Sequence, residues 1–189
     1  MSIPSCFRMP TQVKITGRTS TITNSFVNGI VPCKPPTKEE LSEVLRILGL
    51  DASDLRCAYC GDRATEWDHL HPLVTGRRPT GYISEIANLV PACGKCNQSK
   101  GARHWREWMT STARLSPVSR GVPDLEERIN RLERFEEWAH PTVIDFKEVV
   151  GDALWERHWQ NLDRLVLLMH ECEETASAMR DTIRARYPV

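Results

Sequence analysis

The chain has 189 residues, with 25 acidic and 25 basic side chains and 40% hydrophobic residues. That length suits one domain with its own core, or a small site module with helical additions. No apolar run approaches the ~18 residues of a membrane helix, and the first ten residues lack the basic-then-apolar order of a secretion signal. We therefore expect a cytoplasmic protein that does not bind a membrane.

Charge is distributed unevenly along the chain. Residues 77–121 contain eight lysines and arginines but only two glutamates, and residues 1–36 contain four basic residues and no acidic one. From residue 122 onward the balance is acidic. A neutral chain with such segregated charge can still attract phosphate locally. The alternative, that these are ordinary solvated surface charges, stays open at this point.

Residues 1–54 are predicted to form N-terminal strands followed by one helix. The segment 11–31 is rich in Thr, Val and Ile, and Ile22, Phe26 and Ile30 share one parity, which favours short strands. The sequence PCKPP at 32–36 ends them. Thr37 and Glu40 then form a capping box, which predicts a helix that begins there and runs to residue 48.

Residues 55–110 contain two Cys-x-x-Cys pairs, Cys57 with Cys60 and Cys93 with Cys96. Zinc prefers four soft ligands in a tetrahedron, so the two pairs together predict a structural zinc site. A redox role would need one pair in a thioredoxin-like βαβ context, which the sequence lacks. Four thiolates leave no open position on the ion, so any chemistry requires a second, harder metal.

The residues between and after the cysteine pairs follow a specific order. It runs Cys-x-x-Cys, Asp-His in WDHLHP, Asn in NLVPAC, then Cys-x-x-Cys-Asn and Lys in CGKCNQSKG. This order resembles the HNH, or ββα-metal, nucleases, and within them the zinc-bound branch that includes phage endonuclease VII and several restriction enzymes. The resemblance covers about residues 55–104. It implies a ββα-metal module with a four-cysteine zinc knot. With the N-terminal strands and C-terminal helices expected from the residue pattern on either side, the predicted fold class is α+β.

The resemblance also implies roles for four residues. Asp68 and Asn97 would bind a catalytic Mg²⁺ or Mn²⁺ through hard oxygen ligands. His69, which is neutral at cellular pH when unperturbed, would take a proton from the attacking water. Asn88 matches the asparagine that ties the hairpin together and positions the base. The alternatives are a structural turn for the Asp68–His69 pair and an ordinary turn for Asn88.

Basic side chains near this module are candidates for DNA contact. Arginines can bridge phosphates or read guanine edges, and a solvated loop is the alternative. The candidates are Arg77 and Arg78 in the loop GRRPTGY, and Lys100 and Arg103 after the fourth cysteine. We expect Trp67 and Trp105 in the core and His71 to stabilise the hairpin.

Residues 111–189 are predicted to be helical and to support DNA binding, dimerisation or both. One helix is expected at 124–139, whereas residues 143–150 are ambiguous between strand and helix. A longer helix is expected at 152–186. Its apolar residues are spaced four and three apart like a coiled-coil seam: Trp155, Trp159, Leu162, Val166 and Met169. The seam predicts a homodimer interface, and the alternative is packing within the chain's own domain.

The sequence thus predicts a metal-dependent endonuclease that hydrolyses phosphodiester bonds in double-stranded DNA. Its size and flanking segments favour a sequence-specific type II restriction endonuclease, with a DNA methyltransferase as a possible companion. One alternative is a structure-selective or nicking HNH nuclease. Another is a zinc module that binds DNA without catalysis.

Overall fold

The computed structural model describes residues 10–187. The chain forms two compact units, one made of residues up to Phe26 together with those from Val150 onward, the other running from Val27 to Val149. These units differ from the predicted ranges 1–54, 55–110 and 111–189, because helices on both sides of the cysteine pairs belong to the Val27–Val149 unit. No helix in the described part is long and apolar enough to span a membrane.

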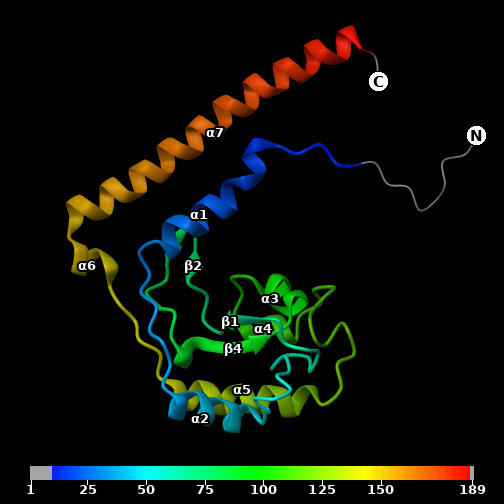
Figure 1. Ribbon diagram of the computed structural model, residues 1–189, viewed down its shortest axis with the longest axis vertical. Coiled ribbons are helices and arrows are strands. Elements are labelled where there is room, and N and C mark those ends of the chain that lie inside the picture. The colour runs from blue at the N-terminus through cyan, green and yellow to red at the C-terminus, as the bar shows by residue number, and fades with distance from the viewer. Residues whose placement is uncertain (1–9, 188–189) are drawn as a thin grey trace, which may run out of the picture. The chain divides into compact units, whose positions relative to one another are not determined.

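Two helices, α2 (Lys38–Leu48) and α5 (Leu125–Ala139), pack side by side in the Val27–Val149 unit (Figure 1). The predicted capping box is present, since Thr37 accepts from the Glu40 backbone and Glu40 accepts from the Thr37 backbone. Gly49 ends α2 in the left-handed conformation, φ 62°, which glycine adopts without strain. The helices predicted at 37–48 and 124–139 are therefore confirmed.

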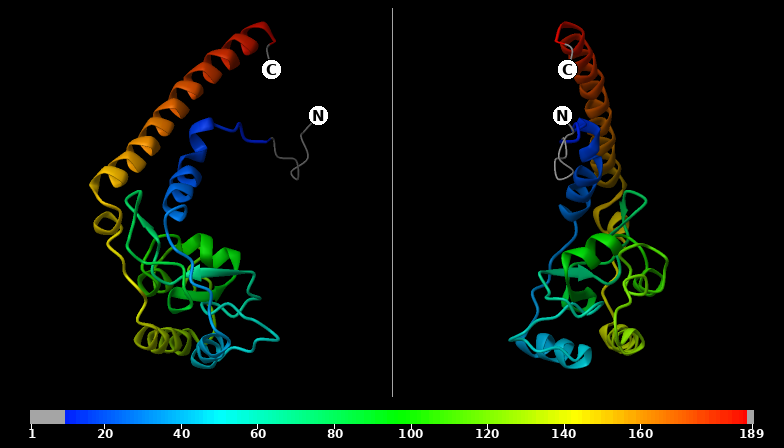
Figure 2. Two further views of the ribbon diagram at one scale, coloured as in Figure 1. Left: turned by 60° about the vertical axis from the view of Figure 1, so that its left-hand side comes forward. Right: turned by 90° about the vertical axis from the view of Figure 1, so that its right-hand side faces the viewer.

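The four short strands form two antiparallel pairs in this unit. Strand β1 (Glu66–His69) pairs with β4 (Leu89–Ala92), and Asp68 lies opposite Val90. Between them β2 (Val74–Thr75) pairs with β3 (Arg78–Pro79), and this hairpin extends away from the β1–β4 pair (Figure 2). Helix α3 (Gly94–Lys100) follows β4 and packs on β1, which gives the ββα order that the resemblance implies.

Segment 81–85, which leads into β4, is held from two sides. On one side Ser84 pairs with the segment after helix α1 (Thr19–Asn28), where Lys34 N donates to Ser84 O at 2.8 Å. On the other side Ile144 N donates to Gly81 O at 2.9 Å. Gly81 has φ +104°, and a Cβ there would lie 2.9 Å from Val143, so this close approach requires glycine.

The remaining elements of the Val27–Val149 unit are short. The 3-10 helix η2 (Ile86–Asn88) precedes β4, and α4 (Trp105–Met109) follows α3. Helix α6 (Phe146–Val150) begins near the end of the unit, and an isolated bridge joins Val143 to Tyr82. The ambiguous segment 143–150 is therefore a bridge followed by a helix. Trp105 is buried as predicted, whereas Trp67 is 37% exposed and does not lie in the core.

The prediction of strands in residues 11–31 is wrong, because most of this segment is helical. It forms the 3-10 helix η1 (Ile15–Arg18) and α1 (Thr19–Asn28). Ile22, Phe26 and Ile30 are four residues apart, so they share one helical face as readily as one strand parity. In this helix Thr23 is buried, and Ile22 and Phe26 are partly buried.

Helix α7 (Asp152–Arg186) matches the predicted long helix and packs against η1 in its own unit. Ile15 N donates to Glu173 at 2.5 Å, and His158 Nε2 lies 3.1 Å from Phe26 O. Trp159, Leu162 and Met169 are buried within this chain. Three of the five residues of the predicted seam are therefore buried within the chain itself, where the N-terminal segment packs against α7, whereas Trp155 and Val166 are partly exposed.

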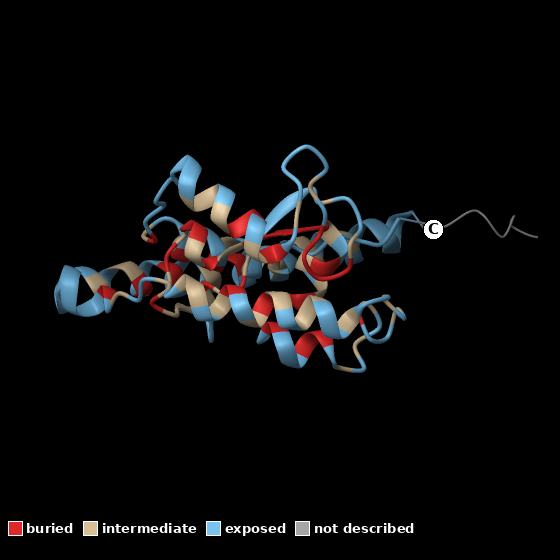
Figure 3. Cartoon of the chain, turned by 90° about the horizontal axis from the view of Figure 1, so that it is seen from below, coloured by how far each residue is buried: buried red, intermediate tan, exposed pale blue. Residues whose placement is uncertain are grey.

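Most buried residues belong to the Val27–Val149 unit (Figure 3). Its core includes the four paired cysteines and three large side chains with almost no exposure, Tyr59, Trp105 and Trp108. The described part of the other unit buries few residues by comparison. The cysteine pairs thus lie in the core of the larger unit, beside the β1–β4 pair.

Candidate functional site

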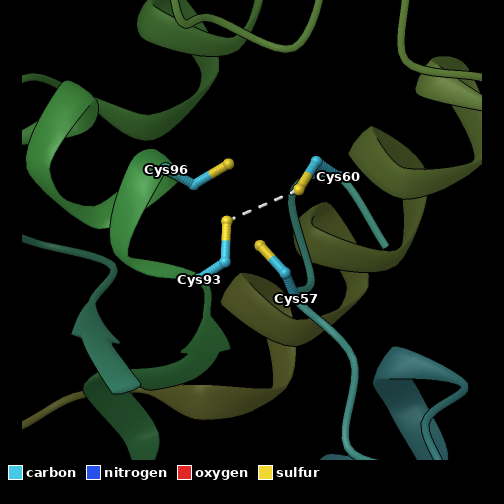
Figure 4. A group of neighbouring side chains, drawn as sticks. All are labelled: Cys57, Cys60, Cys93 and Cys96. Carbon is cyan, nitrogen blue, oxygen red and sulfur yellow. Dashed lines mark hydrogen bonds between the residues drawn. The ribbon is translucent and has the colours of Figure 1, made fainter. Parts of the chain in front are cut away.

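The four paired cysteines form one buried cluster. Their sulfur atoms all lie within 4.8 Å of one another, and Figure 4 shows them pointing toward a common centre from two segments of the chain. Cys60 Sγ and Cys93 Sγ are 3.7 Å apart. Sulfurs that each lie about 2.3 Å from a tetrahedral zinc ion are about 3.8 Å from one another. The cluster therefore fits zinc in both donor type and spacing.

Backbone hydrogen bonds shape the first cysteine turn. Cys57 N donates to Asp62 O at 2.7 Å, and Gly61 N donates to Cys57 O at 2.9 Å. Gly61 has φ +77°, and a Cβ there would lie 2.6 Å from Nη2 of Arg128 on α5. Arg120 adds a positive charge, with Nη1 3.4 Å from Cys96 Sγ. An arginine beside the sulfurs stabilises the thiolate form that zinc requires.

The thiols of the cluster bind protons unequally. Hydrogen bonding with Cys57 holds the pKa of Cys60 far below its usual value. The pKa of Cys57 is raised to about 12, chiefly by its hydrogen bond with Cys60. Zinc binds thiolates, so loading this cluster releases the protons that the bare thiols retain.

Asp68 on β1 is buried and held from two directions. Tyr59 Oη donates to Asp68 Oδ2 at 2.6 Å, and Lys100 Nζ lies 3.3 Å from Oδ1 and 3.2 Å from Oδ2. Burial raises the pKa of Asp68, against the opposing effect of the Lys100 charge. Burial also raises the pKa of Tyr59 well above its usual value, so the phenol keeps its proton and acts as the donor.

Lys100 does not lie where a phosphate-binding lysine is expected. It is 1% exposed, and its Nζ donates to His69 O at 2.8 Å as well as to Asp68. Burial lowers its pKa, against the attraction of Asp68. Because α3 packs on β1, this side chain lies in the interior, where it is the counter-charge of Asp68.

His69 has one ring nitrogen held by a hydroxyl. Its Nε2 lies 2.8 Å from Ser84 Oγ. Ser84 lies on segment 81–85, which forms hydrogen bonds with residues 32–34 and 142–144. Burial, and then the positive charge of Lys100, lower the pKa of His69 to about 4. The imidazole is therefore neutral at pH 7. In the tautomer in which Nε2–H donates to Ser84, Nδ1 is the nitrogen that can accept a proton.

Asn88 is fully buried and joins the two sides of the hairpin region. Its Oδ1 accepts from His71 N at 2.8 Å, and its Nδ2 donates to His71 O at 3.0 Å. The ring of His71 stacks on Tyr82 with centroids 4.6 Å apart, and its Nε2 lies 3.3 Å from Glu136 on α5. Burial lowers the pKa of His71, and Glu136 opposes that shift.

Asn97 lies on α3, one helical turn before Lys100, and contacts a carboxylate other than Asp68. Its Nδ2 donates to Glu66 Oε2 at 2.5 Å. Glu66 and Asp68 are two residues apart on β1, so their side chains share one face of the strand. With Nδ2 engaged by Glu66, the amide oxygen of Asn97 is the atom left to act as a hard ligand.

The predicted DNA-contacting arginines lie at two places. Gly76 and Arg77 form the two-residue turn between β2 and β3, both with positive φ, 57° and 64°. This turn type matches the twist of a hairpin but strains a non-glycine residue. Arg77 is exposed at the tip. Arg103 is also exposed, and it folds back so that its Nε donates to Lys100 O at 3.3 Å.

Three residues at this site were not singled out from the sequence. Tyr59 stands between two cysteines, Glu66 is two positions before Asp68 on the same strand face, and Ser84 is distant in the sequence from His69. The spacing of Glu66 and Asp68 could have been noticed from the strand period. The contacts of Tyr59 and Ser84 are tertiary, and no local sequence signal indicates them.

Asp68 and Asn97 provide fewer ligands for a hard metal ion than the four cysteines provide for zinc. Within residues 10–187, the cysteine cluster is the sole group of three or more His, Cys, Asp or Glu side chains close enough to hold an ion. Asp68 and Asn97 offer one carboxylate and one amide. Mg²⁺ commonly takes one or two protein carboxylates, with water and substrate phosphate completing its shell, so the residues present fit such an ion.

Comparisons with known proteins agree with this geometry. Residues 57–103 match the family model for HNH endonuclease. The CRISPR-associated endonuclease Cas9 of Corynebacterium diphtheriae is 32% identical over 80 residues, which is 40% of this chain and 7% of that protein. The chain thus spans a small fraction of the length of this relative. No solved structure shows significant similarity to the chain.

The matched residues contain both cysteine pairs, β1, β4 and α3. They also contain the Asp-His pair and both asparagines that the resemblance identified. Residues 57–103 of this chain therefore form an HNH endonuclease domain with the four-cysteine cluster of the zinc-binding branch.

Proposed function

We propose that this chain is a metal-dependent endonuclease that hydrolyses phosphodiester bonds in double-stranded DNA. The observation that supports the proposal most is the assembly around β1. Lys100, which lies on α3 one turn after Asn97, forms an ion pair with Asp68. Ser84 forms a hydrogen bond with the ring of the adjacent His69. A neutral imidazole, a buried carboxylate and an amide ligand are thus gathered within one small module.

The side chains divide the chemistry between them. Neutral His69 accepts the proton of the attacking water on Nδ1, and Ser84 keeps the ring from turning. Asp68 and Asn97 would hold Mg²⁺ or Mn²⁺. When bound, such an ion supplies positive charge to the phosphate and the leaving oxygen. Asn88 keeps the hairpin in register through both hydrogen bonds to His71.

In this proposal zinc binds the four-cysteine cluster and not the catalytic residues. Four thiolate ligands fill a tetrahedral shell, so the ion has no open position for water. Its contribution is structural, since it fixes the turn of Cys57 and Cys60 against the start of α3. Such sites contribute on the order of 10 kcal/mol to the folding of small modules.

The finer proposal is a type II restriction endonuclease that acts as a homodimer on a short palindrome. A two-fold dimer places one site on each strand. Because Trp159, Leu162 and Met169 of α7 are already buried within the chain itself, the proposed dimer would use another surface. The HNH similarity supports nuclease chemistry and does not distinguish a restriction enzyme from a nicking or structure-selective nuclease.

Digestion of supercoiled plasmid DNA of mixed sequence tests both the endonuclease proposal and the finer proposal of a restriction enzyme. We expect the chelated, zinc-retaining protein to be inactive and to cut after Mg²⁺ or Mn²⁺ is added. Discrete linear fragments support a sequence-specific double-strand cut, whereas nicked circles support a nicking enzyme. A branched DNA junction in a parallel arm detects structure-selective cutting.

Absence of cutting in every arm, by protein that is folded and contains zinc, would contradict the endonuclease proposal. A non-catalytic zinc module that binds DNA would then take its place. Light scattering with and without DNA gives the oligomeric state, and a monomer that makes double-strand cuts contradicts the two-fold arrangement.

A further inference from the structure

Tyr59 connects the cysteine cluster to the carboxylate of Asp68. It occupies a middle position of the first Cys-x-x-Cys turn, so its backbone is placed by Cys57 and Cys60 on either side. Its side chain has no exposed surface, and its hydroxyl reaches Asp68 Oδ2 at 2.6 Å. One side chain therefore spans from the turn that would hold zinc to the residue that would hold the catalytic metal.

The position of Tyr59 is fixed at both ends. The ring packs edge-on against Trp108, with centroids 5.2 Å apart and planes at 87°. Next to it in the turn, Ala58 N donates to Pro91 O on β4 at 2.8 Å. The hydroxyl has therefore little freedom to leave Asp68 while the cysteine turn keeps its shape.

Asp68 has little freedom of its own, because its two buried partners lie on different elements. Tyr59 approaches Oδ2 from the cysteine turn, and Lys100 approaches both oxygens from α3. A carboxylate has about four lone-pair positions. Donors on some of them fix the plane of the group and leave other positions for a metal.

We infer that Tyr59 is a positioning residue that links the four-cysteine cluster to the metal-binding carboxylate of Asp68. The inference rests on the proposed function, in which Asp68 is a ligand of Mg²⁺ or Mn²⁺. Partners that orient a ligand of this kind commonly change metal affinity or activity by about 10–100-fold when they are removed. The cysteine cluster then acts on the nuclease site through a specific hydrogen bond, in addition to stabilising the fold.

The variant Tyr59→Phe in the full chain tests this link, because it keeps the ring on Trp108 and removes the hydroxyl. We expect its zinc content, measured by elemental analysis, to equal that of the wild type. We expect its affinity for Mn²⁺, titrated by electron paramagnetic resonance without DNA, to fall by about tenfold. Cleavage should weaken at limiting Mg²⁺ and recover at saturating Mg²⁺.

Tyr82→Phe is the matched control, because Tyr82 stacks on His71 through its ring and the variant keeps that ring. It removes a tyrosine hydroxyl from the same unit and should leave Mn²⁺ affinity unchanged. Equal Mn²⁺ affinity in wild type and folded, zinc-loaded Tyr59→Phe overturns the inference alone. Wild-type protein that neither binds Mn²⁺ nor cuts DNA overturns the proposed function together with this inference.

A second measurement needs no change at position 59. The chain has three tyrosines, so 3-fluorotyrosine labelling gives three fluorine resonances, and Tyr82→Phe and Tyr187→Phe assign Tyr59 by elimination. We expect diamagnetic Mg²⁺ to shift the Tyr59 resonance and not that of Tyr187. A Tyr59 resonance that stays unchanged at Mg²⁺ concentrations that support cleavage contradicts the link.

Discussion

Ser84 Oγ lies 2.8 Å from Nε2 of His69, although the two residues are on different segments of the chain. Segment 81–85 is held by hydrogen bonds to residues on both sides, from Ser84 N to Pro32 O and from Thr142 N to Glu85 Oε1. The orientation of the imidazole therefore depends on segments that lie outside residues 57–103.

Ser84→Ala should lower the single-turnover cleavage rate by about 10–100-fold, because the His69 ring loses the group that orients it. DNA affinity and zinc content should not change. Ser84→Thr keeps a hydroxyl and should retain most of the rate. Equal rates for Ser84→Ala and wild type at saturating Mg²⁺ would show that Ser84 does not orient the base.

His69→Ala should lower the cleavage rate by about 10²–10⁴-fold, the usual contribution of a positioned general base. Binding to a DNA duplex, measured by fluorescence anisotropy, should be retained because the ring is partly buried and held by Ser84. The exposed His170 on α7 provides a control, and His170→Ala should cut at the wild-type rate. Wild-type cleavage by His69→Ala would remove this residue from the mechanism.

Lys100→Met should destabilise the fold by about 3–5 kcal/mol, because it leaves Asp68 buried without its counter-charge. The free energy of unfolding in urea measures this effect. Lys95→Met on the same helix is the control, because Lys95 is exposed, and it should change stability by less than about 0.5 kcal/mol. A Lys100→Met protein of normal stability with weaker DNA binding would instead restore the phosphate-contact role predicted from the sequence.

The stability of the wild type should fall as the pH decreases from 7 to 5, in part through His71. Burial lowers the pKa of His71 in the folded protein, whereas the unfolded chain has the ordinary pKa near 6.5. The unfolded state therefore binds a proton first, and stability is lost as the pH falls below that value. His71→Phe keeps a ring beside Tyr82 and should show a smaller loss of melting temperature. An identical pH dependence in the two proteins would exclude a contribution from His71.

Arg77→Gly should stabilise the β2–β3 hairpin while weakening DNA binding, so the two effects can be measured independently. Arg77 has φ 64°, and glycine at such a position relieves about 1 kcal/mol of strain. If Arg77 contacts one phosphate, the slope of log affinity against log salt should decrease by about 0.9. Arg77→Lys keeps the charge and the strain, so it should bind DNA like the wild type. An unchanged salt slope in Arg77→Gly would place this residue outside the DNA interface.

The elements that were predicted correctly have strong local signals. Thr37, Glu40 and Gly49 define both ends of α2 by themselves, and the cysteine spacing indicates the cluster without any knowledge of the fold. The segment 11–31 was assigned wrongly because the spacing of Ile22, Phe26 and Ile30 satisfies both a strand and a helix. Only packing decides between the two, and packing partners are not visible in a local pattern.

The candidate site shows the same division between local and tertiary information. The order of Asp68, His69, Asn88 and Asn97 could be read from motifs, whereas the partners that orient them could not. Lys100 was expected on the surface because lysines usually are exposed, yet the packing of α3 on β1 buries it. The seam on α7 was identified correctly as apolar, but the sequence did not show which segment covers it.

The described residues of the unit that contains α7 come from the two ends of the chain, up to Phe26 and from Val150 onward. The contacts of Ile15 with Glu173 and of Phe26 with His158 therefore join residues that are separated in the sequence by the whole Val27–Val149 unit. During synthesis, the N-terminal segment leaves the ribosome well before its partners on α7 have been translated. The unit that carries the HNH domain has all its residues available earlier, so translation order gives it the first opportunity to fold, and the helical unit is completed last.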